Sequence, residues 1–279
     1  MEWAAHASDW PMADSSQFIL CKPHKWHVQI AGDGPLILLI HGAGGATQSW
    51  RHLFPLLAKT SRVVAIDLPG QGFTKLGAQG RCGLVEMAQD ITRLCAAQGW
   101  KPVAVVGHSA GAAIALQMNL SAKIIGINAA LDTFKGVAGV MFPFFAKTLA
   151  MLPMVADVFI ATSTRGQGVQ RLIDSTGSKL SATDIRFYRR LCQDRNHVNG
   201  TLQMMAQWDL SPLINRLGSI KAETLLIATA NDQMVPADVS RRAAEALPNG
   251  TVLQTADFGH LAHEEAPDVI SKIVTKFIG

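Results

Sequence analysis

The stretch that decides the fold is Val103-Ala104-Val105-Val106-Gly107-His108-Ser109-Ala110-Gly111-Ala112. Its first four residues are apolar and mostly β-branched, which predicts a buried strand. The apolar run 112–116 that follows predicts a buried helix. The pattern G-x-S-x-G lies between them. This context predicts a sharp turn that presents the hydroxyl of Ser109 as a nucleophile at the N-terminus of a helix.

The small residues around Ser109 carry as much of this prediction as the serine does. Gly107 and Gly111 stand two residues before and two residues after it, where the strand and the helix must approach closely. A G-x-S-x-G pattern alone is more often a coincidental turn than a nucleophile. The flanking strand and helix therefore decide between the two interpretations.

Strand and helix patterns alternate along the rest of the chain. This alternation predicts an α/β fold, with a mostly parallel central sheet and helices on both faces. Residues 1–25 are expected to form an irregular arm packed on the surface, and Gly32-Asp33-Gly34 is a hairpin signal. Helices are expected at 48–58, 84–95, 112–116, from 237 to 247 and at the C-terminus. Strands are expected at 26–30, 36–40, 62–66, 103–106, 123–128, 224–228 and 251–255.

The alternation stops between residues 132 and 211, where helical patterns rich in Met and Phe replace it. We expect a core of residues 1–131 and 212–279, with 132–211 inserted as a helical lid whose apolar side faces Ser109. A membrane helix is the alternative for this apolar segment. Charged residues and prolines interrupt it, at Lys147, Asp157, Pro143 and Pro153, and argue against a membrane span.

Composition narrows the class of protein. The 279 residues are 48% hydrophobic and 16% charged, which suits one globular core with an insertion. The net charge of +4 is scattered without a basic run, so we expect no nucleic-acid partner. The four cysteines lack metal-site spacing, and no cofactor motif appears, so we expect reduced thiols, no metal and no cofactor. The first residues do not resemble a signal peptide. We expect a cytoplasmic protein, with peripheral attachment to a membrane as an alternative.

Three residues form the predicted catalytic set: Ser109, Asp232 and His260. Each follows a predicted strand, and the carboxyl ends of parallel strands meet at one edge of a sheet. A serine hydroxyl needs a base beside it, and His260 can take its proton and return it to the leaving group. Asp232 would fix the tautomer of the imidazole and stabilise its positive form.

Each partner of Ser109 has a rival in the sequence. His263 lies close to His260, at the predicted start of the last helix, where a histidine more often caps or packs. Asp132 and Asp257 also follow strands, and for every aspartate a surface or helix-capping role is the alternative. Asp232 is favoured because Asn231-Asp232 and Val235-Pro236 form a tight loop that can aim a carboxylate.

The glycine-rich loop that begins at His41 follows the predicted strand at 36–40. A phosphate cradle is one interpretation, but no G-K-[ST] or spaced dinucleotide pattern follows. The other is half of an oxyanion hole, with the amides of Ala43 and Ala110 as the two donors. His41 is expected to make structural hydrogen bonds at the substrate site rather than to act as a catalyst.

The predicted substrate site combines histidines with flexible and aromatic side chains. Methionine adapts to a broad ligand face and aromatic rings stack on a π-system, although the same residues could simply pack the lid onto the sheet. Six arginines could bind carboxylates or form a solvated helix face: Arg165, Arg171, Arg186, Arg189, Arg190 and Arg195. The predicted substrate-binding residues are His41, His108, Phe134, Met141, Phe145, Met205 and Trp208.

The motifs together resemble the α/β-hydrolase superfamily. They are His41-Gly42-x-Gly-Gly, Asp67-Leu68-Pro69-Gly70-Gln71-Gly72, the segment around Ser109, Asp232 with Val235-Pro236, and Gly259-His260. Further segments resemble the magnesium-chelatase accessory proteins of bacteriochlorophyll biosynthesis: 107–116, 126–131, 197–202, 204–210 and 259–265. This resemblance implies a role near magnesium insertion into protoporphyrin in a phototrophic bacterium. It also implies a magnesium porphyrin and magnesium-chelatase subunits as partners.

Two classes of function follow. The first is a serine hydrolase that acts on an ester or related acyl group of an apolar substrate. The second is an accessory protein that binds a porphyrin without turnover. A generic carboxylesterase or carbon–carbon bond hydrolase is the alternative enzyme. Dehalogenases and epoxide hydrolases are disfavoured because they place an aspartate where this chain has Ser109.

Overall fold

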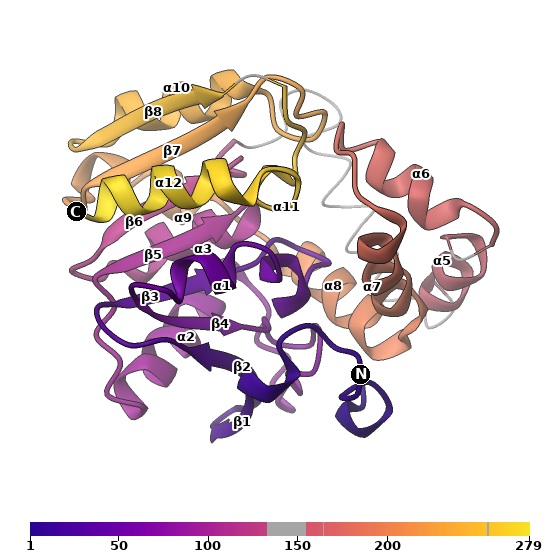
Figure 1. The fold of residues 1–279 in the computed structure, drawn as a ribbon. Helices are drawn as coiled ribbons and strands as arrows, with labels where there is room; N and C mark the ends of the chain where they lie inside the picture. Colours follow the sequence, from indigo (N-terminus) through magenta and orange to yellow (C-terminus); the bar gives the residue numbers. More distant parts are fainter. Residues whose placement is uncertain (133–154, 164, 256) are drawn as a thin grey trace.

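A computed structural model describes residues 1–132, 155–163, 165–255 and 257–279. One sheet of eight strands, in the order β1-β2-β4-β3-β5-β6-β7-β8, runs through the molecule (Figure 1). The pairs β1–β2 and β2–β4 are antiparallel and all the others are parallel, which confirms the predicted sheet. The strands are β1 Ser16–Cys21, β2 His24–Ala31, β3 Leu36–Ile40, β4 Arg62–Ile66, β5 Ala104–His108, β6 Lys123–Ile127, β7 Thr224–Thr229 and β8 Gly250–Thr255.

Helices cover both faces of the sheet. Side chains alternate along each strand, so Ile37 and Leu39 of β3 pack in one cluster while Leu38 and Ile40 pack in the other. The first cluster includes α1 Phe54–Leu57, α11 Ala262–Glu265 and α12 Pro267–Ile278. The second includes α2 Leu84–Ala97, α3 Ala110–Met118 and α10 Ala237–Ala246. Because β3 to β7 are buried on both faces, their sequences read as continuous apolar runs.

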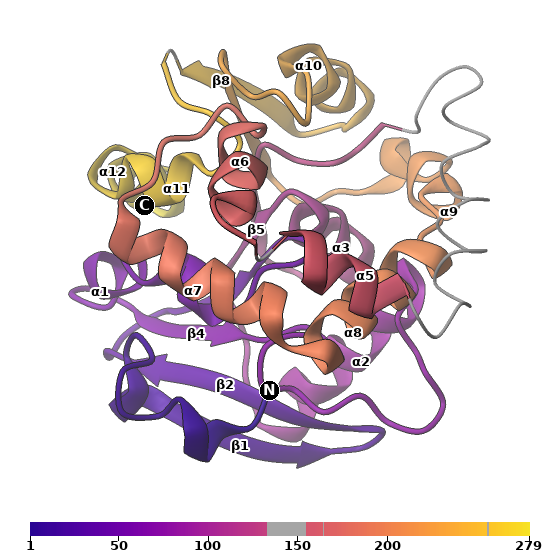
Figure 2. The same ribbon diagram turned by 90° about the vertical axis from the view of Figure 1, so that its right-hand side faces the viewer.

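The chain between β6 and β7 forms a group of helices beyond one end of the sheet (Figures 1 and 2). They are α5 Val155–Ser163, α6 Gly168–Asp174, α7 Ala182–Gln193 and α8 Arg195–Gln207, followed by the short α9 Ser211–Ile214. We call α5 to α8 the insertion. Three predicted substrate-binding residues, Phe134, Met141 and Phe145, lie outside the described residues. Among the described helices, none is long and apolar enough to cross a membrane.

Three local predictions are wrong, and long-range packing explains each. Residues 16–21, expected in an irregular arm, form edge strand β1, and Trp10 before it is buried. Gly32 and Gly34 adopt positive φ, but β4 lies between β2 and β3, so the turn does not make a hairpin. The helix expected at 48–58 is divided into the 3-10 turn Thr47–Trp50 and α1, since 47–50 packs fully buried beside the glycine-rich loop.

Candidate active site

Ser109 lies in a strained turn between β5 and α3. Its φ of 51° and ψ of −116° place it outside the conformations that non-glycine residues ordinarily adopt. The neighbouring glycines make this possible: a Cβ at Gly107 would lie 2.4 Å from the amide of Ala112, and one at Gly111 would lie 2.1 Å from the carbonyl oxygen of Ile40. Strand and helix therefore touch backbone to backbone, and the partly exposed Ser109 stands at their junction.

His260 and Asp232 meet beside this turn. Nδ1 of His260 lies 2.8 Å from Oδ2 of Asp232. The other carboxylate oxygen of Asp232 accepts hydrogen bonds from the amides of Met234 and Val235, at 2.7 Å and 2.9 Å. The loop after β7 thus fixes the carboxylate with its own backbone, and the carboxylate holds a proton on Nδ1 of the imidazole.

The backbone of His260 is also held in place. Its carbonyl oxygen accepts hydrogen bonds from Nε2 of His108 and Nδ2 of Asn128, both at 2.9 Å. Its amide donates to the carbonyl oxygen of Thr176, from the chain between α6 and α7, at 3.1 Å. His260 and Ser109 line the same cavity. His108, predicted to bind substrate, also lines it and is close enough to His260 for the two rings to pack, with centroids 4.7 Å apart.

The rival residues lie elsewhere. Asp132 pairs with Arg242. Asp257 is exposed, with a φ of 70°. His263 is fully buried, with Nε2 2.7 Å from Oγ of Ser49 and its ring packed on Trp50. Burial lowers the pKa of His263 well below 6.5, so it is neutral at neutral pH.

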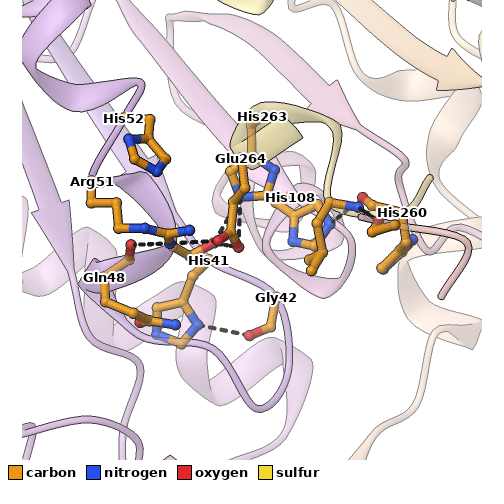
Figure 3. Close-up of polar contacts among 12 residues, drawn as sticks. His41, Gly42, Gln48, Arg51, His52, His108, His260, His263 and Glu264 are labelled. Carbon is orange, nitrogen blue, oxygen red and sulfur yellow. Dashed lines mark hydrogen bonds and ion pairs between the residues drawn. The ribbon is translucent and has the colours of Figure 1, made fainter. Parts of the chain in front are cut away.

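His41 is fully buried and does not line the cavity, and its ring contacts the carbonyl oxygen of Gly42 (Figure 3). Its Nε2 accepts the amide proton of Leu68 at 2.9 Å, so Nδ1 carries the ring proton and donates to the carbonyl oxygen of Gly42 at 2.7 Å. The amide of Gly45 donates to the same oxygen at 3.1 Å. Together these bonds orient the Gly42–Ala43 peptide, and hence the Ala43 N–H. Burial lowers the pKa of His41, which keeps Nε2 free to accept.

The amides of Ala43 and Ala110 come from two loops at the carboxyl ends of adjacent strands, β3 and β5. Ala110 is the first residue of α3, where an amide has no partner within the helix. Ala43 is exposed at the cavity, one residue after the anchored Gly42.

The cavity has a volume of about 420 Å³, within the range of small-molecule sites. No Asp, Glu, Lys or Arg of the described chain lines it. Met205, predicted to bind substrate, lines it, while Trp208 packs against the core outside it and none of the six arginines reaches it. The insertion contributes its apolar wall: Phe159, Leu172, Ile173, Val198, Leu202 and Met205.

A buried ionic network beneath the cavity was not foreseen from the sequence. Glu264 accepts hydrogen bonds from Nη1 of Arg51 at 2.5 Å, from Ser49, and from the hydroxyl of Tyr188 (Figure 3 shows the Arg51 contact). Burial raises the pKa of Glu264, and Arg51 opposes that shift. Arg51 also donates to Asp184 on α7 at 2.6 Å. The network therefore joins the insertion to the core, through residues more than 130 positions apart.

A second Ser–His–Asp arrangement exists near the N-terminus. Nδ1 of His27 lies 2.7 Å from Asp67, and Nε2 lies 3.0 Å from Oγ of Ser16. None of the three lines the cavity. Asp67 also accepts hydrogen bonds from the amides of Thr47 and Phe73, at 2.6 Å and 2.8 Å. Asp67 therefore holds two loops in place. A serine, a histidine and an aspartate within hydrogen-bond distance of one another are therefore insufficient to define a site without a cavity beside them.

The alpha/beta hydrolase family model matches residues 37–273. The chain belongs to this family. It is 42% identical to the magnesium-chelatase 30 kDa subunit of Rhodobacter capsulatus, over 100% of this chain and 99% of that protein. It is 28% identical to the 2-hydroxy-6-oxo-6-phenylhexa-2,4-dienoate hydrolase of Burkholderia cepacia, over 90% of each chain. An α/β-hydrolase-fold protein from Burkholderia ambifaria superposes with a TM-score of 0.79 at 21% identity, covering 95% of this chain and 98% of the other.

Proposed function

We propose that the protein is a serine hydrolase that cleaves an ester or related acyl group of an uncharged, apolar substrate. The observation that carries the proposal is the shared cavity: Ser109 in its strained turn and His260, bound to Asp232, both line it. In this proposal His260 takes the proton of the Ser109 hydroxyl as Oγ attacks the acyl carbon. His260 then returns the proton to the leaving group, and water completes the reaction through the same base.

The negative charge that develops on the substrate oxygen needs donors already in place. The amides of Ala43 and Ala110 are the proposed pair, and loss of one such donor costs about 100- to 1,000-fold in turnover in a serine protease. The bonds from His41 and Gly45 to the Gly42 carbonyl support this assignment, because they fix the peptide that carries the Ala43 N–H.

The lining of the cavity supports the substrate class. A carboxylate or ammonium group that entered it would lose its water without meeting an opposite charge on the described walls, at a cost of several kcal/mol. An uncharged acyl chain would instead bury apolar surface against the insertion, which favours binding.

The similarity to the Rhodobacter capsulatus magnesium-chelatase subunit supports a second proposal about the setting. We propose that the substrate or ligand belongs to magnesium-porphyrin metabolism and that magnesium-chelatase subunits are partners. A non-catalytic porphyrin-binding accessory protein is the alternative that this similarity favours. Similarity to the Burkholderia cepacia hydrolase favours a carbon–carbon bond hydrolase among the enzymes. In either setting we propose a cytoplasmic location, peripheral attachment to a membrane being the alternative.

A fluorophosphonate probe with intact-mass detection tests the hydrolase proposal without knowledge of the substrate. The wild type should gain one phosphonyl group, and the Ser109→Ala variant should gain none. Ser16→Ala is the matched control, because Ser16 contacts a histidine but lies outside the cavity. That control should label as the wild type does. An unlabelled wild type, or a labelled Ser109→Ala variant, would reject Ser109 as the nucleophile.

A further inference from the structure

Helix α8 of the insertion contacts two loops: the glycine-rich loop after β3, which carries Ala43, and the loop after β4. Its backbone reaches the loop after β4 at Gly200, where a Cβ would lie 2.1 Å from the carbonyl oxygen of Gly70. Only glycine allows helix and loop to meet this closely. Figure 1 shows α8 on the sheet side of α5 and α7. The position of α8 is therefore set by the core.

His197, in the first turn of α8, bridges the two loops. Its Nδ1 accepts the amide proton of Gly72 at 2.9 Å, so the ring proton of the neutral imidazole lies on Nε2. Nε2 then donates to the carbonyl oxygen of Gly44 at 3.2 Å. His197 is 3% exposed, and its backbone amide donates to Oδ1 of Asp194 at 2.8 Å. The ring therefore has one orientation and one tautomer.

Gly44 stands immediately after Ala43, the proposed oxyanion donor. Its amide donates to Oε1 of Gln71 at 2.8 Å, and its carbonyl accepts from His197. Nε2 of Gln71 in turn lies 3.1 Å from Sδ of Met204 on α8. Gly44 has a φ of 76°, a left-handed conformation that glycine adopts without the steric cost of a Cβ. His41 fixes the peptide before Ala43, and groups on or against α8 fix the peptides on both sides of Gly44.

We propose that His197 is a positioning residue for the oxyanion loop, acting on Ala43 through the Gly44 carbonyl. This inference rests on the proposed hydrolase function. It assigns the insertion a catalytic contribution beyond covering the substrate, since one of its helices holds the loop that must meet the developing charge. A displacement of about 1 Å in such a loop is sufficient to cost on the order of 100-fold in rate.

Two isosteric variants separate the two bonds of the ring. The His197→Asn side chain reaches the position of Nδ1 and can keep the Gly72 bond, but it is too short for Gly44. The His197→Gln side chain reaches the position of Nε2 and can keep the Gly44 bond. Asn196→Ala, an exposed neighbour on the same helix, is the control.

The rate of Ser109 phosphonylation, the kcat and KM for an uncharged chromogenic ester, and affinity for an aryl boronic acid should be measured together. The boronic acid forms a tetrahedral adduct on Ser109. For His197→Asn we expect labelling rate, kcat and boronate affinity to fall about 10- to 100-fold, with KM within about twofold. We expect His197→Gln to recover most of that loss, and Asn196→Ala to match the wild type.

The thermal unfolding temperature of each variant should be measured as well. Equal losses in both His197 variants, or a loss that follows the unfolding temperature alone, would overturn the positioning role and leave a structural one. A His197→Asn variant that is folded and fully active would also overturn it. If the wild type neither labels nor turns over an ester, the hydrolase proposal fails, and the role of His197 fails with it. If the wild type labels and His197→Asn labels equally fast, only the role of His197 fails.

Discussion

Nδ1 of His260 lies 2.8 Å from Oδ2 of Asp232, while the carboxylate of Asp132 pairs with Arg242 instead. The sequence offered both aspartates as the partner of the histidine. Geometry separates them, because only one of the two carboxylates contacts an imidazole that lines the cavity. The catalytic consequence can be tested with isosteric substitutions.

Asp232→Asn should reduce turnover of an uncharged ester on the order of 10,000-fold, whereas Asp132→Asn should change it less than about threefold. An amide keeps the shape of the carboxylate, but it favours the wrong tautomer of the imidazole, and this is the size of the loss in a serine protease. Steady-state kinetics on both variants provide the comparison. A crippled Asp132→Asn enzyme with an active Asp232→Asn enzyme would show that the acid is misassigned.

Substitution of His260 should affect catalysis, whereas substitution of His263 should affect stability. His260→Ala should abolish phosphonylation of Ser109 while the protein remains folded. His263→Ala should retain labelling but lose about 2–4 kcal/mol of stability, because it removes a fully buried ring from between Trp50 and His108 and one of the two hydrogen-bond partners of Ser49. Urea unfolding and the labelling assay report the two effects separately. If His263→Ala also fails to label while folded, the base would have to be reassigned.

The acid side of the stability profile should depend on His197. Burial lowers its pKa from 6.5 to about 4. Between pH 4 and pH 6.5 this histidine is therefore protonated in the unfolded chain and neutral in the folded protein. The stability that the neutral His197 contributes is therefore fully present above pH 6.5 and is lost as the pH falls toward 4. A shift of this size corresponds to about 3 kcal/mol from this residue. The free energy of unfolding of the wild type should fall over this range, and His197→Gln should flatten the slope. Parallel slopes in the two proteins would contradict the assignment.

The parts of the candidate site that the sequence predicted are those whose geometry is local or follows directly from a parallel sheet. The turn at Ser109 needs only a strand, two glycines and a helix within ten residues, and the local sequence pattern predicts all of them. Asp232 and His260 could be predicted because parallel strands bring their ends to one edge. The prediction of a hairpin at Gly32–Gly34 is wrong because the strand that separates β2 from β3 comes from residues 62–66. The sequence around Gly32 carries no sign of that pairing.

The long-range contacts that hold the candidate site in place could not be predicted from the sequence. Arg51 and Glu264 are 213 residues apart, and each looks like an ordinary surface charge until the fold buries both. The role of His197 depends on Gly44 and Gly72, which come from two other loops. The sequence predicts His41 at the substrate site as the first residue of the glycine-rich loop, but its ring does not line the cavity and instead donates to the Gly42 carbonyl. Such contacts are properties of the packed molecule.

The last prediction separates an apolar-ester hydrolase from a porphyrin-binding accessory protein. Met205 lines the cavity and Trp208 lies outside it, so a tetrapyrrole bound there should respond to Met205→Ala and not to Trp208→Phe. Binding of protoporphyrin and its magnesium form can be measured by quenching of tryptophan fluorescence, with their dimethyl esters in parallel. Because no charged group of the described chain lines the cavity, the uncharged dimethyl esters should bind about tenfold or more tightly than the diacids if the macrocycle enters it. Equal binding of acid and ester, unchanged in Met205→Ala, would place the tetrapyrrole on another surface. Fast turnover of apolar esters with no porphyrin binding at all would leave the hydrolase and reject the link to magnesium porphyrins.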